Sequence, residues 1–471
     1  MGIGELADAF ARKSLSPVEV SRALLERIEA AQPLLRAYSH VDPQRTLEEA
    51  RQSEARMRRG ERLGMLDGVP VSYKASYGVR GWPATSGTIA LADRRADQDH
   101  ALVARVRALG GVTLGLTGMP DLGFCTCSIS SEAGVIRNPW DISRTTGGSS
   151  AGAGAAAAAG LGPMHFGSDG YGSVRLPAAW TGTIGFVPGS GSGLLARGID
   201  DIAHVYAAMG SGVRWHSERG RWAGYLPMPA QQPFPERGLP PLASLAGLRV
   251  AYLPQASPDS FPPEDDVMAV VEAAVHAIAA GDGIEIERLA PLLPLGSKAA
   301  SGVTVFTKAR RDILADFPAE RFALLDVLPR ELTERAAAVS DVEFEQAQRR
   351  AHEIWDDFTL TRPLDRFDIV LTPSVRIRPF QADQRYPDGY DPYLVPHGLD
   401  DGTATVIELG IFNMLGGWSC FNLPCGFTRD GLPVGLQVAI RPSADAVALS
   451  MQATAHLQRV LGMQPATMPF D

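Results

Sequence analysis

A run of alanine and glycine at residues 151–160 places the strongest limit on how this chain can fold. Alanine has the highest helix propensity of all residues, so the run predicts a helix. Such a helix has no bulky side chains, and other elements can approach its backbone closely. Gly147 and Gly148 precede it and let the chain turn where a Cβ atom would clash. The run therefore predicts a helix that its neighbours contact closely.

Two serines flank this predicted helix and are candidate nucleophiles. Ser149 precedes it, and Ser173 follows it in a glycine-rich segment. Lys74 is a third candidate, because it ends an apolar segment that predicts a short strand. Each residue also has an ordinary alternative. A serine can cap a helix or lie in a simple turn, and a lysine at the end of a strand is usually at the surface.

Taken together, the three segments resemble the amidase signature family. The family pattern is a Gly-Gly-Ser-Ser segment, a helix of small residues and a Gly-Thr-Asp-x-Gly-Gly-Ser-x-Arg-x-Pro segment, with a lysine further upstream. The resemblance implies that Ser173 attacks the substrate, that a cis peptide bond holds Ser149, and that neutral Lys74 accepts a proton through Ser149. Burial would lower the pKa of Lys74 and so favour the neutral amine that this relay needs.

The resemblance also implies an oxyanion hole in the turn that carries Ser173. Its backbone N–H donors would be those of Gly170, Tyr171, Gly172 and Ser173. Tyr171 stands where the family has glycine, so it would be strained if that position needs a positive φ. If the position has ordinary dihedral angles, the Tyr171 ring instead shapes the substrate pocket.

Two charged residues flank the same turn. Asp169 and Arg175 carry opposite charges, and we expect them to pair and brace the turn rather than to take part in the chemistry. A substrate pocket is expected beside the turn, and tight core packing is an alternative for the same residues. The predicted pocket residues are Cys125, Thr126, Cys127, Tyr171 and Trp418.

Strands and helices alternate along the rest of the chain, which predicts an α/β protein. Ser16 and Glu19, for example, predict the start of an early helix. The resemblance implies the amidase signature fold, a central twisted mixed β-sheet flanked by α-helices on both sides. It extends over nearly the whole chain. We therefore expect a single domain over residues 1–471, although the length alone would suggest about three.

Residues 189–193 read GSGSG, which is the composition of a flexible linker. Family members have a longer segment at this point, so the loop is shortened in this chain. Two explanations are open: an engineered linker that bridges a removed loop, or a natural short glycine loop. Either explanation predicts a more open mouth of the active site on this side.

Composition argues against several other classes of protein. The chain has 471 residues and a formal net charge of −9, which argues against a nucleic-acid partner or an anionic membrane surface. It has no long uncharged apolar run and no signal-peptide pattern, so we expect neither a membrane span nor secretion. The cysteines, Cys125, Cys127, Cys420 and Cys425, lack the spacing of a zinc site. We expect reduced thiols in a cytoplasmic protein, with no metal and no cofactor.

These observations predict a serine hydrolase that cleaves carboxylic amide C–N bonds through an acyl-enzyme. Its substrate would be a small-molecule amide or carbamate, and an apolar pocket would suit anilides, urethanes and esters. Two alternatives stay open: a glutamine-hydrolysing amidotransferase subunit that supplies ammonia to a partner enzyme, or a catalytically silent scaffold. The oligomeric state also stays open, and a homodimer is one alternative.

Overall fold

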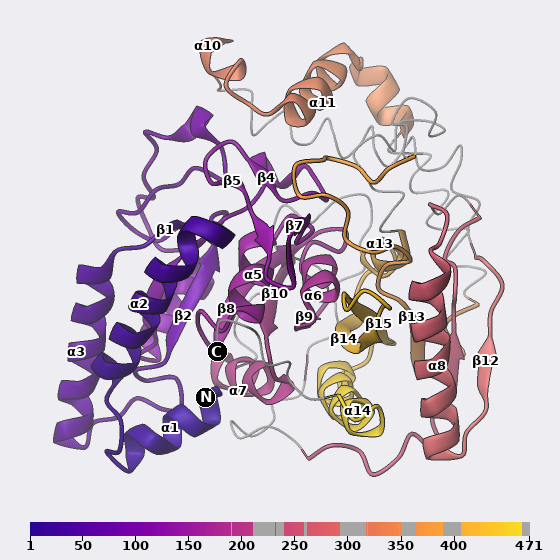
Figure 1. Ribbon diagram of the computed structural model, residues 1–471, viewed down its shortest axis with the longest axis horizontal. Coiled ribbons are helices and arrows are strands. Elements are labelled where there is room, and N and C mark those ends of the chain that lie inside the picture. The colour runs from indigo at the N-terminus through magenta and orange to yellow at the C-terminus, as the bar shows by residue number, and fades with distance from the viewer. Residues whose placement is uncertain are drawn as a thin grey trace.

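An 11-stranded mixed β-sheet runs through the centre of the protein (Figure 1). The computed structural model describes residues 1–189, 191–210, 231, 240–258, 261–292, 317, 319–347, 349, 363–389 and 407–463. The strands are β1 (Tyr38–His40), β2 (Pro70–Lys74), β3 (Val112–Thr117), β8 (Met164–Asp169), β9 (Ile184–Val187), β10 (Gly191–Ala196), β11 (Val250–Tyr252), β12 (Ile286–Arg288), β13 (Ile369–Pro373), β14 (Ser419–Phe427) and β15 (Pro433–Ile440).

The order of the strands combines segments from both ends of the chain. It is β1-β3-β2-β8-β10-β9-β14-β15-β13-β11-β12. Strand β2 is parallel to both β3 and β8, whereas β10 is antiparallel to both β8 and β9. Two further pairs of short strands lie outside this sheet: β4 (Ile129–Ser130) with β5 (Gly134–Val135), and β6 (Arg137–Asn138) with β7 (Asp141–Thr145).

Helices cover both faces of the sheet (Figure 1). The described helices are α1 (Ile3–Ala11), α2 (Pro17–Leu35), α3 (Pro43–Arg59), α4 (Ala101–Ala108), α5 (Ala151–Ala158), α6 (Arg175–Thr181), α7 (Ile199–Met209), α8 (Asp265–Asp282), α10 (Ala319–Phe322), α11 (Val327–Ala338), α13 (Ile407–Leu415) and α14 (Ala446–Val460), with short 3₁₀ turns η1 (Ile89–Leu91) and η2 (Asp121–Gly123). Of these, α10 and α11 lie apart from the sheet, at the top of Figure 1. Among the helices that the structure describes, none has the length and apolar character needed to cross a membrane.

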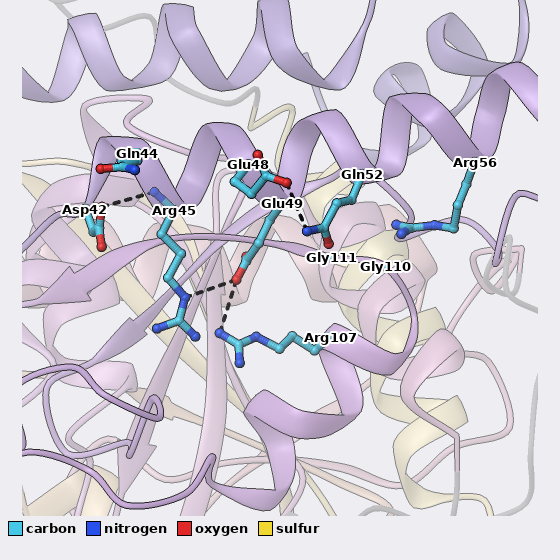
Figure 2. A pocket seen from close by; sticks show the side chains of 10 residues that line it. All are labelled: Asp42, Gln44, Arg45, Glu48, Glu49, Gln52, Arg56, Arg107, Gly110 and Gly111. Atoms are coloured by element: carbon cyan, nitrogen blue, oxygen red, sulfur yellow. Dashed lines mark hydrogen bonds and ion pairs between the residues drawn. The ribbon is translucent and has the colours of Figure 1, made fainter.

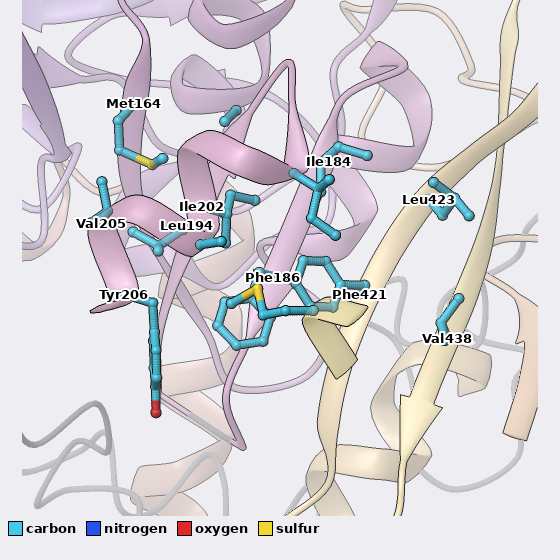
Figure 3. Packing of buried hydrophobic residues seen from close by; sticks show 14 of the residues in the cluster. Met164, Ile184, Phe186, Leu194, Ile202, Val205, Tyr206, Phe421, Leu423 and Val438 are labelled. Carbon is cyan, nitrogen blue, oxygen red and sulfur yellow. The ribbon is translucent and has the colours of Figure 1, made fainter. Parts of the chain in front are cut away.

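Adjacent residues of one strand pack into different layers, because successive side chains point to opposite faces of a sheet. Leu195 of β10 packs with alanines of α5 and α6. Leu194 packs on the other face with Phe186 and with residues of α7, as Figure 3 shows. On that face the rings of Phe186 and Phe421 stack with their centroids 4.4 Å apart. The predicted α/β fold, a mixed sheet with helices on both sides, is confirmed.

Helix α5 is the predicted helix of small residues, and all of its residues are buried. A Cβ atom at Gly152 would lie 2.1 Å from the carbonyl oxygen of Ala37 and 2.5 Å from the backbone nitrogen of Gly118. At Gly154 it would lie 2.9 Å from Cβ of Pro177 in α6. The neighbours of α5 therefore occupy the space that larger side chains would need, which confirms the predicted close packing.

The expectation of a flexible linker at residues 189–193 is wrong for the part that the structure describes. Residues 191–193 begin β10, where they pair with residues 167–169 of β8 in the central sheet. A Cβ atom at Gly193 would lie 2.5 Å from the carbonyl oxygen of Phe186, so this position needs glycine for close strand packing. Ser190 lies outside the described residues. Gly193 thus serves strand packing rather than flexibility.

His165 is a fully buried histidine near the start of β8. Its Nδ1 lies 2.5 Å from Oγ of Ser72, and its Nε2 lies 3.2 Å from the carbonyl oxygen of Gly162. Burial, together with the charge of Arg197, lowers the pKa of His165 to about 3, although the hydrogen bond to Gly162 opposes this shift. The folded protein therefore holds His165 in its neutral form.

We expect His165 to make the protein less stable as the pH falls from about 6.5 towards 3. In this range the unfolded chain binds a proton that the folded chain excludes, which costs about 2 kcal/mol at pH 5. The check is the midpoint of urea unfolding at pH 7.5 and pH 5 for the parent and for His165→Asn. The variant should lose less stability than the parent over this interval. An equal loss would contradict the assignment.

Candidate active site

Lys74 is buried at the carboxyl end of β2, where only 1% of its surface is exposed. Its Nζ lies 2.7 Å from Oγ of Ser149 and 2.9 Å from Oγ of Ser168. Strand β2 runs parallel to β8, so Lys74 and Ser168 lie near the carboxyl ends of neighbouring strands. The buried amine therefore contacts two hydroxyl groups at one edge of the sheet.

Ser149 lies at the start of α5, and the cis peptide bond that the resemblance implies is present between Gly148 and Ser149. The backbone of Gly148 is tightly enclosed. A Cβ atom there would lie 2.3 Å from the carbonyl oxygen of Cys127 and 2.6 Å from that of Cys125. On another side, a Cβ atom at Gly123 would lie 3.2 Å from Oγ of Ser149. Surrounding backbone thus fixes the position of Ser149 beside Lys74.

Ser173 lies in the turn between β8 and α6, next to the start of α5. Its carbonyl oxygen accepts a hydrogen bond of 3.0 Å from the backbone N–H of Ser150. Ser173 is half-buried, whereas Ser149 and Lys74 are buried. The Ser173 hydroxyl forms no hydrogen bond with the residues that the structure describes. The inner contact of the expected relay, between Lys74 and Ser149, is therefore formed. The outer contact, between Ser149 and Ser173, is not.

The buried pair of Asp169 and Arg175 spans the turn that carries Ser173. The Nη2 atom of Arg175 lies 2.8 Å from Oδ1 of Asp169. Backbone N–H groups of Gly172 and Val174 donate to the same carboxylate at 2.7 and 2.9 Å. Burial by itself would raise the pKa of Asp169, but the charge of Arg175 and these hydrogen bonds outweigh it and lower the pKa to about 2. Asp169 is therefore a fixed anion that organises the turn.

Two further polar residues of this network were not singled out from the sequence. Asn413 of α13 donates from Nδ2 to Oδ1 of Asp169 at 3.0 Å, and its own Oδ1 accepts from Arg175. Gln437 of β15 accepts from Nη1 of Arg175 at 2.5 Å. The only available signal was that both are polar residues within otherwise apolar segments. Their partners lie more than 230 positions away along the chain.

The expected oxyanion hole needs one correction. The N–H of Gly172 donates to Asp169, so it does not face a substrate. The N–H groups of Gly170 and Ser173 form no hydrogen bond with the described part of the chain. The backbone φ of Tyr171 is not positive, whereas Gly172 has a φ of 107°. Glycine thus occupies the position of the turn that needs a positive φ, and Tyr171 does not.

The predicted pocket residues separate into two groups. Cys125, Cys127 and Tyr171 belong to one apolar cluster, which also contains Leu409 of α13. Thr126 lies between the two cysteines and is half-buried. Trp418 instead belongs to another cluster, where its ring packs against Phe412 with centroids 5.2 Å apart. Trp418 therefore packs in the core, as the alternative interpretation had it, and does not join the other predicted residues.

A surface cavity of about 590 Å³ lies away from these residues, along α3 and the turn before β3 (Figure 2). Its charged groups largely satisfy one another. Glu49 contacts Arg45 at 3.3 Å and Arg107 at 3.1 Å. None of the predicted site residues lines this cavity. Within the described residues, no group of three or more His, Cys, Asp or Glu side chains is arranged to hold a metal ion.

Comparison with known proteins places this chain in one family, over most of its length. The sequence model of the Amidase family matches residues 19–192 and 189–449. An acylamidase of Rhodococcus erythropolis is 30% identical over 94% of this chain and 92% of its own length. A glutamyl-tRNA(Gln) amidotransferase subunit of Cupriavidus pinatubonensis is 31% identical over 92% of this chain and 91% of its own length.

Solved structures share the fold at lower sequence identity. A bacterial aryl acylamidase of the amidase signature enzymes superposes with a TM-score of 0.82 at 23% identity, covering 98% of this chain and 96% of its own. The 6-aminohexanoate cyclic dimer hydrolase superposes with a TM-score of 0.81 at 24% identity, covering 99% of this chain and 98% of its own.

Ser168 provides a test of this site, because its hydroxyl is the second contact of the Lys74 amine. We expect Ser168→Ala to lower kcat/KM about tenfold to a hundredfold, since a small misplacement of a catalytic group is costly. Ser168→Thr keeps the hydroxyl and should retain most of the activity. The check is steady-state kinetics of both variants on one amide. Equal activities of the Ala and Thr variants would show that the contact is unimportant.

Proposed function

This chain belongs to the amidase signature family and is an amide hydrolase, and we propose that it cleaves carboxylic amides through an acyl-enzyme formed on Ser173. The observation that carries the proposal is the 2.7 Å contact between the buried Lys74 amine and the hydroxyl of Ser149. A serine hydroxyl needs a base to become a nucleophile. Lys74 is a buried amine that can take this role through Ser149.

The proposed reaction begins with attack of Ser173 Oγ on the substrate carbonyl. Its proton passes to Ser149, and Ser149 passes its own proton to neutral Lys74. The outer hydrogen bond of this relay would form with substrate bound, because catalytic hydrogen bonds often tighten only in that complex. Backbone N–H groups of Gly170, Tyr171 and Ser173 would stabilise the oxyanion, and one such donor is typically worth about 3 kcal/mol.

The collapse of the tetrahedral intermediate needs the same proton again. A leaving nitrogen departs poorly as an anion, so Lys74 returns the proton to it through Ser149. The C–N bond then breaks and leaves the acyl group on Ser173. Water attacks this acyl-enzyme, and the same relay removes its proton. The cycle ends with a free carboxylic acid and the original hydroxyl of Ser173.

The substrate class that we propose is small neutral amides with an apolar acyl or aryl group, with carbamates, anilides and esters as related substrates. The apolar cluster around Tyr171, Cys125 and Cys127 supports this choice. The named acylamidase relative acts on the same class of bond. Since the central sheet draws strands from residues 38 to 440, we also propose that residues 1–471 work as one catalytic domain.

A second candidate function is supported by the relatives named as amidotransferase subunits, at 31% identity. In this function the chain would release ammonia from glutamine for a partner enzyme. A hydrolysis screen of aryl amides, carbamates, esters, primary amides and glutamine separates the two candidates. Turnover of aryl amides by the chain alone supports the first candidate. Glutamine hydrolysis that needs a partner supports the second.

A serine-directed fluorophosphonate probe tests the nucleophile directly. We expect the parent to be labelled and Ser173→Ala to lose both labelling and amide turnover, because Ser173 is the proposed nucleophile that forms the acyl-enzyme. Ser143→Ala is a matched control, since Ser143 is exposed and its hydroxyl donates only to Asp141 of the same strand, β7, within the described residues. The control should label like the parent. A parent that resists labelling would favour a catalytically silent scaffold.

A further inference from the structure

The ring of Tyr171 lies directly against the backbone of α13. A Cβ atom added to Gly410 would lie 2.3 Å from Cε1 and Cζ of this ring and 2.6 Å from Cε2. Such distances are too short for any real contact, so only glycine fits at position 410 while the ring keeps its place. A glycine inside a helix makes the helix less stable than an alanine would, by about 1 kcal/mol. The glycine in α13 therefore provides the space that the ring occupies.

The turn and the helix on either side of this contact are held by one network. Gly172 follows Tyr171, and a Cβ atom there would lie 2.8 Å from Cβ of Leu409. The carbonyl oxygen of Leu409 accepts a hydrogen bond of 3.0 Å from Arg175. Arg175 in turn pairs with Asp169, which holds the N–H of Gly172. The backbone positions of Tyr171 and of its contact surface are thus fixed together.

Tyr171 is the half-buried member of the apolar cluster that lies nearest to Ser173 along the chain. The cluster draws residues from separate segments, including Phe124 and Cys125 before α5, Ile377 after β13, and Leu328 of α11. The apolar cluster thus includes a residue, Tyr171, that lies two positions before Ser173.

We propose that Tyr171 is a specificity-determining residue, whose ring limits the size of the apolar substrate group bound next to Ser173. The inference rests on the proposed function, because it takes Ser173 as the nucleophile. A tyrosine ring is bulky and has few rotatable bonds, so it forms a firm boundary at low entropic cost. The backbone of Gly410 prevents the ring from moving back to admit a larger group.

The test uses kcat/KM for p-nitroanilides with acyl groups of increasing size, from acetyl to benzoyl and pivaloyl. A second series of acetamides carries amines of increasing size. In Tyr171→Ala we expect the ratio of large to small substrates to rise about tenfold or more in one series, the scale of discrimination that an apolar pocket provides. Tyr171→Phe keeps the ring and should keep the parent's order of preference.

Gly410→Ala tests whether the effect acts through the ring. The added methyl group must displace the Tyr171 ring, so this variant should change the ratio in the parent background. In the Tyr171→Ala background it should change nothing further, because the ring is gone. This non-additivity is the expected sign of direct coupling between the two positions. Thermal unfolding of each variant shows which ones are folded.

Unchanged ratios in both series for an active, folded Tyr171→Ala would overturn the proposal. An equal effect of Gly410→Ala in both backgrounds would also overturn it. If Gly410→Ala does not fold, the comparison of Tyr171→Ala with Tyr171→Phe still decides. A failure of the proposed function would be recognised by a different result: the fluorophosphonate probe would not label Ser173 in the parent protein.

Discussion

The contact of the Lys74 amine with the hydroxyls of Ser149 and Ser168 is the interaction on which the rest of the site depends. It requires two parallel strands to end side by side, because Lys74 ends β2 and Ser168 lies near the end of β8. It also requires α5 to pack closely enough for Ser149 to reach the same point. The alanines and glycines of α5 allow this approach, since larger side chains would hold the helix away from the sheet.

A second constraint holds the nucleophile in place. The charge of Asp169 is buried, and such a charge is tolerated only when it is paired and hydrogen-bonded. Arg175, Asn413 and backbone N–H groups satisfy it. This pairing also joins the turn at Ser173 to α13 and β15, which come from the far end of the chain. The active site thus needs both halves of the sheet to be folded.

Local sequence signals predicted the parts that local interactions decide. Ser16 and Glu19 form the expected capping box at α2, because each partner lies within one helical turn. The small residues of α5 likewise predicted both a helix and its close packing. The GSGSG segment was interpreted from its composition, which shows only that large side chains are missing. Composition does not show that residues 191–193 pair with β8 in the central sheet.

Features that depend on contacts between residues far apart in the sequence could not be predicted from the sequence. Ser168 stands where the family pattern has threonine, and nothing near it in the sequence indicated that it contacts the Lys74 amine. The loss of Gly172 from the expected oxyanion hole depends on the direction of one N–H group. Trp418 is an aromatic residue near the C-terminal strands, and only the packing of the sheet shows which cluster it joins.

The most direct test of the account is the rate at which Ser173 becomes acylated when Lys74 is replaced. The rate can be followed under single-turnover conditions by mass spectrometry of the peptide that carries Ser173, with urea unfolding as a check that the variant is folded. If Lys74 is the base, Lys74→Ala should acylate about a thousandfold more slowly than the parent or worse, as when one member of a catalytic triad is lost. A folded variant that keeps most of the parent's rate would contradict the relay.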